Sequence, residues 1–314
     1  MQNAIEVQGL VKVYNRGERG VEPVLAVDHI DFQVRQGEIF GFLGPNGAGK
    51  TTTIRMLTGL TRPSGGSARI LGYDLLRDLS QIKKRTGVVP EASNLYDELT
   101  AFENLVFSMQ LYGVPRRDRK ARAETLLEQF RLGGKRDTIF AKLSRGMKRA
   151  LTIAAALAHN PSLVFLDEPT TGLDVMSARN LRQMIAGMRE AGVTVFLTTH
   201  YLKEAERLCD RIAMLVNGRI VALDTVDRLK SGAQEKTIVE VTTVDSNGCV
   251  GTERFLTDDG VEAAIYLALE QRGGRRVLAV NTLRPSLEDV FVNLTGLSAE
   301  VMLAEKAGKG KGNG

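Results

Sequence analysis

The sequence predicts an α/β protein with a largely parallel sheet, followed by a smaller α+β domain. Apolar runs of strand length recur up to about residue 230, and stretches with helical periodicity separate them. A mostly helical stretch at about 91–160 interrupts this alternation and predicts an inserted helical subdomain. After about residue 230 the pattern changes, so we expect a first domain over 1–230 and an accessory domain over 236–303.

Local patterns predict the individual elements of the first domain. Alternating apolar and polar side chains over 5–14 and 24–34 indicate half-buried antiparallel strands, which would form an antiparallel β subdomain. The short apolar run 38–43 is expected to be a buried strand that leads into a helix over 50–58. Further strands are expected at 87–89, 163–166, 193–198 and 212–216, and further helices at 101–112, 117–130, 145–158 and 175–191.

The C-terminal elements are predicted from shorter patterns. A linker is expected at 230–233, and Ser286 and Asp289 are spaced as a capping box that opens a helix. The last residues, 304–314, alternate Lys and Gly and are expected to be a disordered tail. The remaining elements expected here are strands at 237–243 and 277–281 and a helix at 261–271.

Composition narrows the class of protein. A hydrophobic content of 43% and a charged content of 25% are ordinary for a globular chain. The net charge of +5 is mild and the basic residues are scattered, so no nucleic-acid partner is expected. Cys209 and Cys249 have no metal spacing and indicate reduced thiols of the cytosol. We expect neither a signal peptide nor a membrane-spanning helix, so work at a membrane would need a partner protein.

A glycine-rich motif carries the strongest chemical signal. Residues 44–51 read GPNGAGKT, which matches G-x-x-x-x-G-K-[ST] between a predicted buried strand and a predicted helix. Backbone N–H groups of such a loop and the helix N-terminus form a cradle for phosphates. Lys50 is expected to bridge the β- and γ-phosphates, and the Thr51 hydroxyl to ligate Mg²⁺. The binding residues predicted in this segment are Gly44, Pro45, Asn46, Gly47, Ala48, Gly49, Lys50, Thr51 and Thr52.

Two acids end a second predicted buried strand, LVFLDE at 163–168. At the end of a strand close to the phosphate loop, Asp167 could reach the Mg²⁺ shell. Glu168 would point elsewhere and could polarise an attacking water as a general base. Adjacent acids at a strand end can also be merely solvated, so their catalytic interpretation depends on the phosphate loop that precedes them.

Five elements in their order and spacing resemble the ABC ATPases over about residues 4–230. They are the P-loop, the paired acids, LSRGM at 143–147, GLD at 172–174, and His200 after an apolar strand. The resemblance is closer to ATPase subunits of bacterial exporters for drugs, antibiotics or polysaccharides. RPSLEDVF at 284–291 is similar to the C-terminal region that many of those subunits carry.

The resemblance implies roles for further residues. Tyr14 matches the aromatic residue on which the family stacks adenine. Ser144 and Gly146 match the signature sequence, which faces the γ-phosphate held by the other subunit. Asp174 matches the residue that communicates across the dimer, and His200 matches the histidine that contacts the γ-phosphate and orients the water. From the residues alone, Ser144 could equally be an ordinary helix cap and His200 a structural histidine.

Two places depart from the family pattern. Glu91 stands where the family usually has Gln, and its carboxylate could still offer an oxygen to Mg²⁺. The metal ligands implied are therefore Thr51, Glu91 and Asp167. Arg145 and Met147 replace the usual Gly and Gln of the signature, and Arg145 lacks the freedom of glycine at positive φ.

As a whole, the resemblance implies a P-loop ABC ATPase core that uses ATP and Mg²⁺ and serves a transporter, more in keeping with export than import. Two copies would sandwich ATP head to tail, with Glu168 and His200 catalytic, and would move a separate transmembrane permease at the cytoplasmic face of the inner membrane. The helical region near 91–112 would transmit that movement. The alternatives are a soluble ABC ATPase of translation or DNA maintenance, a P-loop kinase, and a nucleotide sensor without turnover.

Overall fold

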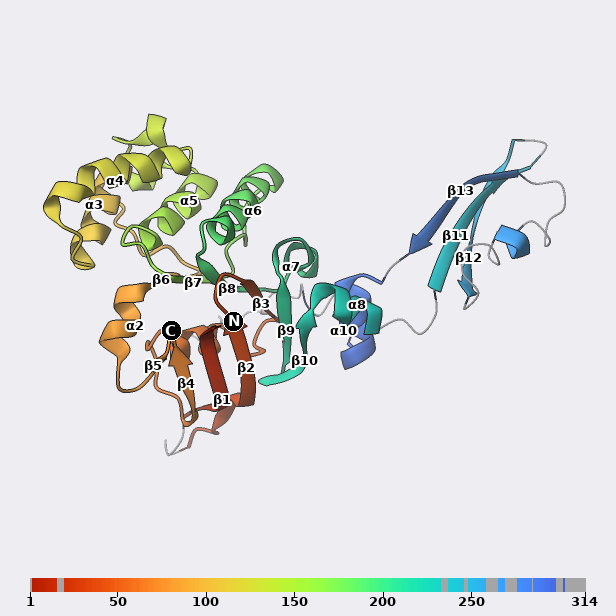
Figure 1. Cartoon of the computed structure of the whole chain (residues 1–314), viewed down its shortest axis with the longest axis horizontal. Helices are drawn as coiled ribbons and strands as arrows, with labels where there is room; N and C mark the ends of the chain where they lie inside the picture. Colours follow the sequence, from red (N-terminus) through yellow and green to blue (C-terminus); the bar gives the residue numbers. More distant parts are fainter. Residues whose placement is uncertain are drawn as a thin grey trace, which may run out of the picture. The chain divides into compact units, whose positions relative to one another are not determined.

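The computed structural model describes residues 2–15, 20–232, 237–245, 248–257, 265–268, 276–283, 285–297 and 302. The chain divides into two compact units, the first containing Met1–Asp224 and the second containing Thr225–Ala299 (Figure 1). Each unit is described by itself below. The expected tail at 304–314 and most of the expected helix at 261–271 lie outside the described residues.

A six-stranded sheet forms the middle of the first unit (Figure 1). All residues of three of its strands, β3 (Ile39–Leu43), β8 (Thr194–Thr199) and β7 (Leu163–Asp167), are buried, which explains their largely apolar sequences. The strands β9, β3, β8, β7 and β6 run parallel, so their carboxyl ends meet at one edge of the sheet. In spatial order the strands are β10 (Arg219–Thr225), β9 (Arg211–Val216), β3 (Ile39–Leu43), β8 (Thr194–Thr199), β7 (Leu163–Asp167) and β6 (Thr86–Val89).

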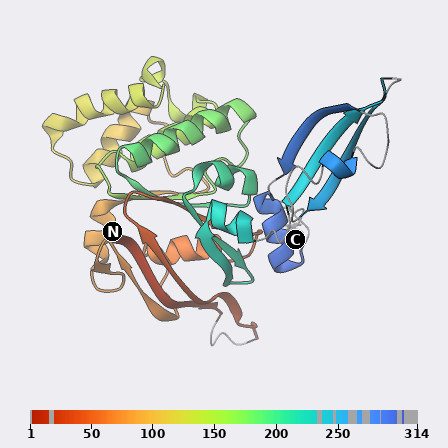
Figure 2. The same ribbon diagram turned by 45° about the vertical axis from the view of Figure 1, so that its right-hand side comes forward.

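A second sheet is antiparallel, as the alternating N-terminal pattern predicted. Its strand order is β2-β1-β4-β5, and the strands are β1 (Asn3–Tyr14), β2 (Val24–Arg35), β4 (Gly65–Ile70) and β5 (Tyr73–Asp74). The helix α1 (Lys50–Leu57) places Ile54, Met56 and Leu57 in one apolar core with residues of both sheets. Figure 2 shows α1, in orange, beside the two sheets. This packing fixes the start of α1, and with it the glycine-rich loop.

Three helices between β6 and β7 gather at one end of the first unit (Figure 1), where the sequence predicted an inserted helical region. They are α3 (Ala101–Leu111), α4 (Arg116–Gln129) and α5 (Arg145–Ala156). α3 begins with a capping box in which Thr100 and Glu103 satisfy each other's backbone N–H groups. The other helices of this unit are α2 (Leu79–Arg85), α6 (Val175–Glu190) and α7 (Leu202–Leu208).

The second unit contains a three-stranded antiparallel sheet in the order β12-β11-β13. The expected linker at 230–233 is wrong as far as Gly232, because α8 (Val226–Gly232) continues through it. The Thr225 hydroxyl accepts a hydrogen bond from the Arg228 N–H at 3.3 Å and so caps this helix. The strands of the three-stranded sheet are β11 (Thr237–Val244), β12 (Val250–Thr257) and β13 (Arg276–Leu283). The second unit also contains α10 (Leu287–Thr295), which begins at the predicted Ser286–Asp289 capping box.

Candidate nucleotide-binding site

The loop between β3 and α1 is held by two close approaches of the backbone. A Cβ atom at Gly44 would lie 2.2 Å from the carbonyl oxygen of Leu215, and one at Gly49 would lie 2.4 Å from that of Ala26. Gly49 also has a φ of 107°, so this turn requires glycine at both positions. Because the N-cap residue Gly49 has no side chain, the first N–H groups of α1 can face a bound anion.

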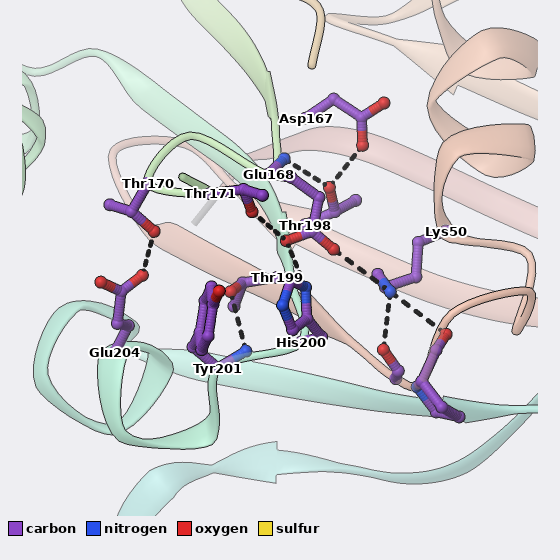
Figure 3. Close-up of polar contacts among 12 residues, drawn as sticks. Lys50, Asp167, Glu168, Thr170, Thr171, Thr198, Thr199, His200, Tyr201 and Glu204 are labelled. Carbon is purple, nitrogen blue, oxygen red and sulfur yellow. Dashed lines mark hydrogen bonds and ion pairs between the residues drawn. The ribbon is translucent and has the colours of Figure 1, made fainter. Parts of the chain in front are cut away.

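Lys50 lies buried inside this loop. Its Nζ donates to the carbonyl oxygens of Gly44 at 2.6 Å and Pro45 at 3.2 Å. The same atom is 3.2 Å from Oε1 of Glu168, at the end of β7 (Figure 3). A buried cation therefore faces both the loop carbonyls and a carboxylate from another strand.

Asp167 is held on the side of the site that faces α1. Its Oδ1 accepts a hydrogen bond from the Thr198 hydroxyl at 2.6 Å and one from the Thr51 hydroxyl at 3.3 Å. Thr51 and Asp167, two of the three predicted metal ligands, are thus brought together. The third, Glu91, lines one cleft together with Thr51; Asp167 is not among the described residues of that lining.

The backbone of Glu168 adopts a left-handed conformation with a φ of 46°. Its N–H donates to the carbonyl oxygen of Thr198 at 3.2 Å and to the hydroxyl of the same residue at 3.1 Å, which holds the turn in place. The two adjacent acids consequently have different partners (Figure 3): Asp167 contacts Thr198, and Glu168 contacts Lys50 and His200. A left-handed non-glycine residue is costly and is found where the surroundings impose it, often at functional sites.

His200 is the principal hydrogen-bond donor to the Glu168 carboxylate. Its Nδ1 donates to Oε2 of Glu168 at 2.9 Å, and the Thr171 hydroxyl is 3.4 Å from the same oxygen. Burial alone would raise the pKa of Glu168, but the hydrogen bond from His200 and the positive charge of Lys50 outweigh it and hold the pKa below its ordinary value. Glu168 is therefore ionised at neutral pH, as a general base must be.

These residues surround a cleft of about 530 Å³, a volume typical of small-molecule sites. Nine of the predicted nucleotide-binding, metal-binding and catalytic residues lie on its wall; they are Asn46, Gly47, Gly49, Lys50, Thr51, Thr52, Glu91, Glu168 and His200. Ala26, Thr171 and Tyr201 line it as well. Tyr14 ends β1 opposite Val24 of β2, and Lys12 Nζ lies 4.9 Å from the centre of its ring.

Arg149 of α5 is a site residue that sequence reasoning missed. Its guanidinium donates to the carbonyl oxygens of Asp167 at 2.7 Å, Pro169 at 2.9 Å and Glu91 at 3.2 Å. Burial lowers its pKa to about 10, against the raising effect of nearby carboxylates, so it stays charged at neutral pH. The one sequence signal was a cation just before a mostly apolar run, 150–158, on a helix predicted to pack against the core.

The signature residue Ser144 and Asp174 of the GLD segment lie at two neighbouring helix starts. Ser144 caps α5, its hydroxyl accepting from the Met147 N–H at 3.3 Å, and Asp174 caps α6, accepting from the Ser177 N–H at 2.9 Å. A Cβ atom at Gly146 would lie 2.5 Å from Ser177 Oγ, so the two helix starts touch there. Neither cap residue nor Gly146 is among the described residues that line the cleft.

Arg145, the departure from glycine in the signature, is the first residue of α5. Its φ is not among the positive values of the described chain, so glycine's conformational freedom is not needed there. Its guanidinium reaches the carbonyl oxygen of Gly172 at 3.3 Å and joins the segments before the two helices.

Comparison with known proteins gives the family. The model of the ABC transporter family matches residues 27–171. The daunorubicin/doxorubicin resistance ATP-binding protein of Streptomyces peucetius is 38% identical over 324 residues, which cover 97% of this chain and 96% of that protein. The chain belongs to the ABC transporter family. The fluoroquinolones export ATP-binding protein of Mycobacterium tuberculosis, a further ABC relative, is 38% identical over 93% of both chains.

Solved ABC ATPase structures share the fold. An ATP-binding subunit of an ABC transporter aligns with a TM-score of 0.64 and 33% identity, over 73% of this chain and 92% of that one. A dimeric bacterial ABC transporter cassette aligns with a TM-score of 0.64 and 27% identity, over 70% and 98%. The predicted α/β ABC ATPase core is confirmed, and the chain is an ATP-binding, ATP-hydrolysing subunit of this family. Within the described residues, no helix has the length and apolar character needed to cross a membrane.

Proposed function

We propose that this ABC ATPase subunit hydrolyses ATP at composite sites of a head-to-tail dimer and so drives a separate export permease. One observation carries the proposal. Glu168 is held ionised between Lys50 and His200 inside the cleft, whereas the signature residues of the same chain lie outside it. The cleft of one chain thus contains the groups proposed for hydrolysis, whereas the signature residues that would complete a composite site lie on another part of the same chain.

In the proposed site, the glycine-rich loop binds the phosphates of ATP. The N–H groups at the start of α1 and the ammonium of Lys50 supply the positive charge. Lys50 already touches the loop carbonyls and Glu168, so it lies between the phosphate cradle and the base. Tyr14 is assigned to adenine stacking by the family resemblance.

The oxygen ligands at the cleft suit Mg²⁺. The Thr51 hydroxyl and the Asp167 carboxylate are 3.3 Å apart, and Glu91 offers a further carboxylate. In the described part of the chain, no group of three or more His, Cys, Asp and Glu side chains could hold a metal. Thr51, Asp167 and Glu91 are few protein ligands for one ion, which suits Mg²⁺, because it keeps waters and phosphate oxygens in its coordination shell. When bound, Mg²⁺ would neutralise charge that develops on the phosphates.

Glu168 is the proposed general base. Its carboxylate takes a proton from the attacking water as the water oxygen bonds to the γ-phosphorus and the bond to the β–γ bridging oxygen of ATP breaks, leaving ADP and phosphate. His200 holds Oε2 of this carboxylate and orients the water. Asp167 accepts the hydroxyl hydrogen bonds of Thr198 and Thr51 at one oxygen, Oδ1, and is not proposed as the base.

The dimer is proposed from the location of Ser144, Gly146 and Asp174. The exposed Ser144 and Asp174 cap two helix starts that touch each other, and two adjacent helix starts favour an anion. At the start of α6, Val175 and Met176 are 80% and 62% exposed, which a second copy would cover. One related cassette is dimeric in two solved structures.

The permease contact is proposed at the end of α3, within the region near 91–112. Leu111, 69% exposed, and Tyr112 lie with Lys83 and Lys84 of α2 around a hollow of about 470 Å³. Exposed apolar side chains beside cations are suited to an amphipathic segment of another protein. Relatives named for drug resistance and export support an exporter at the cytoplasmic face of the inner membrane.

The test compares phosphate release by the wild-type protein and by Glu168→Gln in the presence of Mg²⁺ and ATP. Loss of the base should lower turnover by about 10²–10⁴-fold, while ATP stays bound and a dimer appears on gel filtration. Glu190→Gln, at the exposed end of α6, is the matched control and should hydrolyse at the wild-type rate. Undiminished turnover in Glu168→Gln would contradict the proposed base.

A further inference from the structure

The carboxylate of Glu204 joins three separate elements of the first unit. Its Oε2 accepts a hydrogen bond from the hydroxyl of Thr170, in the turn after β7 (Figure 3). Its Oε1 forms an ion pair with the guanidinium of Arg182 on α6 at 2.6 Å. Thr170 is buried, and the Arg182 and Glu204 side chains are only 19% and 17% exposed. Both carboxylate oxygens are therefore occupied in a partly dry setting, where charge-assisted hydrogen bonds are strong.

The three side chains belong to the segments that carry the proposed catalytic groups. Thr170 is two residues beyond Glu168, and its neighbour Thr171 contacts the Glu168 carboxylate. Glu204 lies in the first turn of α7, the helix that starts directly after His200 and Tyr201. Arg182 lies in the middle of α6, which begins at Asp174.

The contact that these segments must preserve is short. His200 Nδ1 and Glu168 Oε2 are 2.9 Å apart, and each residue stands at the start of a turn that follows its strand. A change of about 1 Å in the alignment of catalytic groups can cost about a hundredfold in rate. Something must hold the two turns together, and the Thr170–Glu204 hydrogen bond joins them.

We propose that Thr170, Glu204 and Arg182 form a positioning clasp that keeps Glu168 aligned with His200 and ties both to α6. The inference depends on the proposed function, because it takes Glu168 as the base and the start of α6 as the partner-facing end. These residues are positioning residues, since none of the three lines the cleft. Movement of α6 at the dimer contact would reach the base through Arg182 and Glu204.

A second ion pair on the same helix provides a matched control. Arg189 lies seven residues after Arg182 and contacts Asp210 at the same distance of 2.6 Å. Asp210 accepts a hydrogen bond from the Ile39 N–H, so this pair joins α6 to the start of β3, at the opposite edge of the sheet from the site. Loss of either ion pair removes one contact that holds α6 in place. Only loss of the Arg182 pair should also disturb the position of Glu168.

The first measurement is steady-state phosphate release by the full chain over a range of ATP concentrations with Mg²⁺. Arg182→Met should lower kcat by about tenfold and leave the KM for ATP within about twofold, because the phosphate loop is intact. Arg189→Met should leave both within about twofold of wild type. Equal loss of kcat in the two variants, or a full kcat in Arg182→Met, would overturn the clasp.

The second measurement is a double-mutant cycle with a conservative rescue. Thr170→Val should lower kcat, and Thr170→Ser, which keeps the hydroxyl, should restore it. Adding Arg182→Met to Thr170→Val should cause little further loss, because both act through Glu204. Independent, multiplying losses would overturn the proposal. If Arg182→Met does not fold, the Val and Ser variants at Thr170 decide it, since kcat must fall in one and recover in the other.

Failure of the clasp and failure of the proposed base give different results. If Glu168→Gln still hydrolyses ATP at the wild-type rate, the proposed base is contradicted, whatever the Arg182 variants do. If Glu168→Gln is inactive and Arg182→Met is fully active, the proposed base stands and the clasp is contradicted.

Discussion

The buried residues of the nucleotide site and the two helix-cap residues Ser144 and Asp174 differ in how their polar groups are satisfied. Lys50, Asp167 and Glu168 are buried, and each contacts side chains or carbonyls from another element of the same chain. Ser144 and Asp174 are exposed, and the hydrogen bonds found for them stay within their own helix starts. The polar groups of the first set are satisfied within one chain, whereas those of the second set can still form hydrogen bonds to a group outside the chain. The difference predicts that a mutation in the first set impairs the site of its own chain and a mutation in the second set impairs the site of the partner copy.

The largest expected effect comes from mixing two defective proteins. Ser144→Arg places bulk and charge in the partner's site, and Lys50→Ala damages its own site. Neither protein alone should hydrolyse ATP, but a mixture should, because one composite site of each mixed dimer carries no lesion. Phosphate release in the mixture and in both pure proteins is the measurement. Wild-type activity in pure Ser144→Arg would break the comparison between the two groups.

Lys50→Ala by itself tests whether the buried residues of the site bind ATP within their own chain. Removing a cation that makes charge-assisted hydrogen bonds should weaken ATP binding by about 10–100-fold, since such bonds contribute about 1.5–3 kcal/mol. Binding of a fluorescent ATP analogue measures the loss, and Lys120→Ala on the surface of α4 is the control. Equal affinity in both variants would mean that Lys50 does not contact the phosphates.

A half-buried histidine in the helical region gives a pH-dependent effect of intermediate size. His159 Nε2 donates to the Thr86 carbonyl oxygen at 3.1 Å, and its ring stacks on Tyr112 at 3.7 Å. Nδ1 is buried, with no hydrogen-bond partner found among the described residues. Burial lowers the pKa of His159 to about 4; the bond to Thr86 opposes this shift and the charge of Arg122 adds to it.

Because the unfolded chain takes up this proton near pH 6.5 and the folded chain near pH 4, the histidine's contribution to stability is full above about pH 6.5. It is lost as the pH falls toward 4. Between about pH 7 and about pH 4, wild type should lose on the order of 2 kcal/mol more free energy of unfolding than His159→Phe. Urea unfolding at both pH values measures this, and parallel losses in the two proteins would contradict it.

The smallest effect is expected from removing the second unit. The described residues that line the cleft all precede Asp224, where the first unit ends. The sequence predicted that the first domain ends at 230, but α8 (Val226–Gly232) belongs to the second unit, so Asp224 is the better end point for a truncated chain. A chain ending at Asp224 should bind ATP within about twofold of full length, while dimer content or transport falls. A well-folded truncated chain with much weaker ATP binding would place the second unit in the nucleotide site.

Sequence reasoning predicted the elements whose signal lies in consecutive residues. The glycine-rich loop, the strand that ends at Asp167 and the helices α3 to α6 each fill one continuous stretch of sequence, and the structure contains them. α2 and α7 were missed because seven residues are too few to show helical periodicity. The short strands β4 and β5 lack a long alternating pattern as well.

The contacts that organise the site could not be predicted, because they join residues distant in the chain. Arg149 reaches Asp167 from 18 positions away and Thr198 reaches it from 31. Each residue type is common at such a place, and only the fold brings them together. The assignments of Ser144, Asp174 and His200 came from the family resemblance, and their roles remain proposals.

The left-handed backbone of Glu168 has a consequence for protein engineering. Glycine adopts that conformation freely, whereas a glutamate held there costs on the order of 1–3 kcal/mol. Glu168→Gly would relieve this strain, but it would also leave the buried ammonium of Lys50 without its carboxylate partner, which costs about 3–5 kcal/mol. The melting temperature of Glu168→Gly should therefore fall. A library sorted only for thermostability would keep a carboxylate at this position without any selection on turnover.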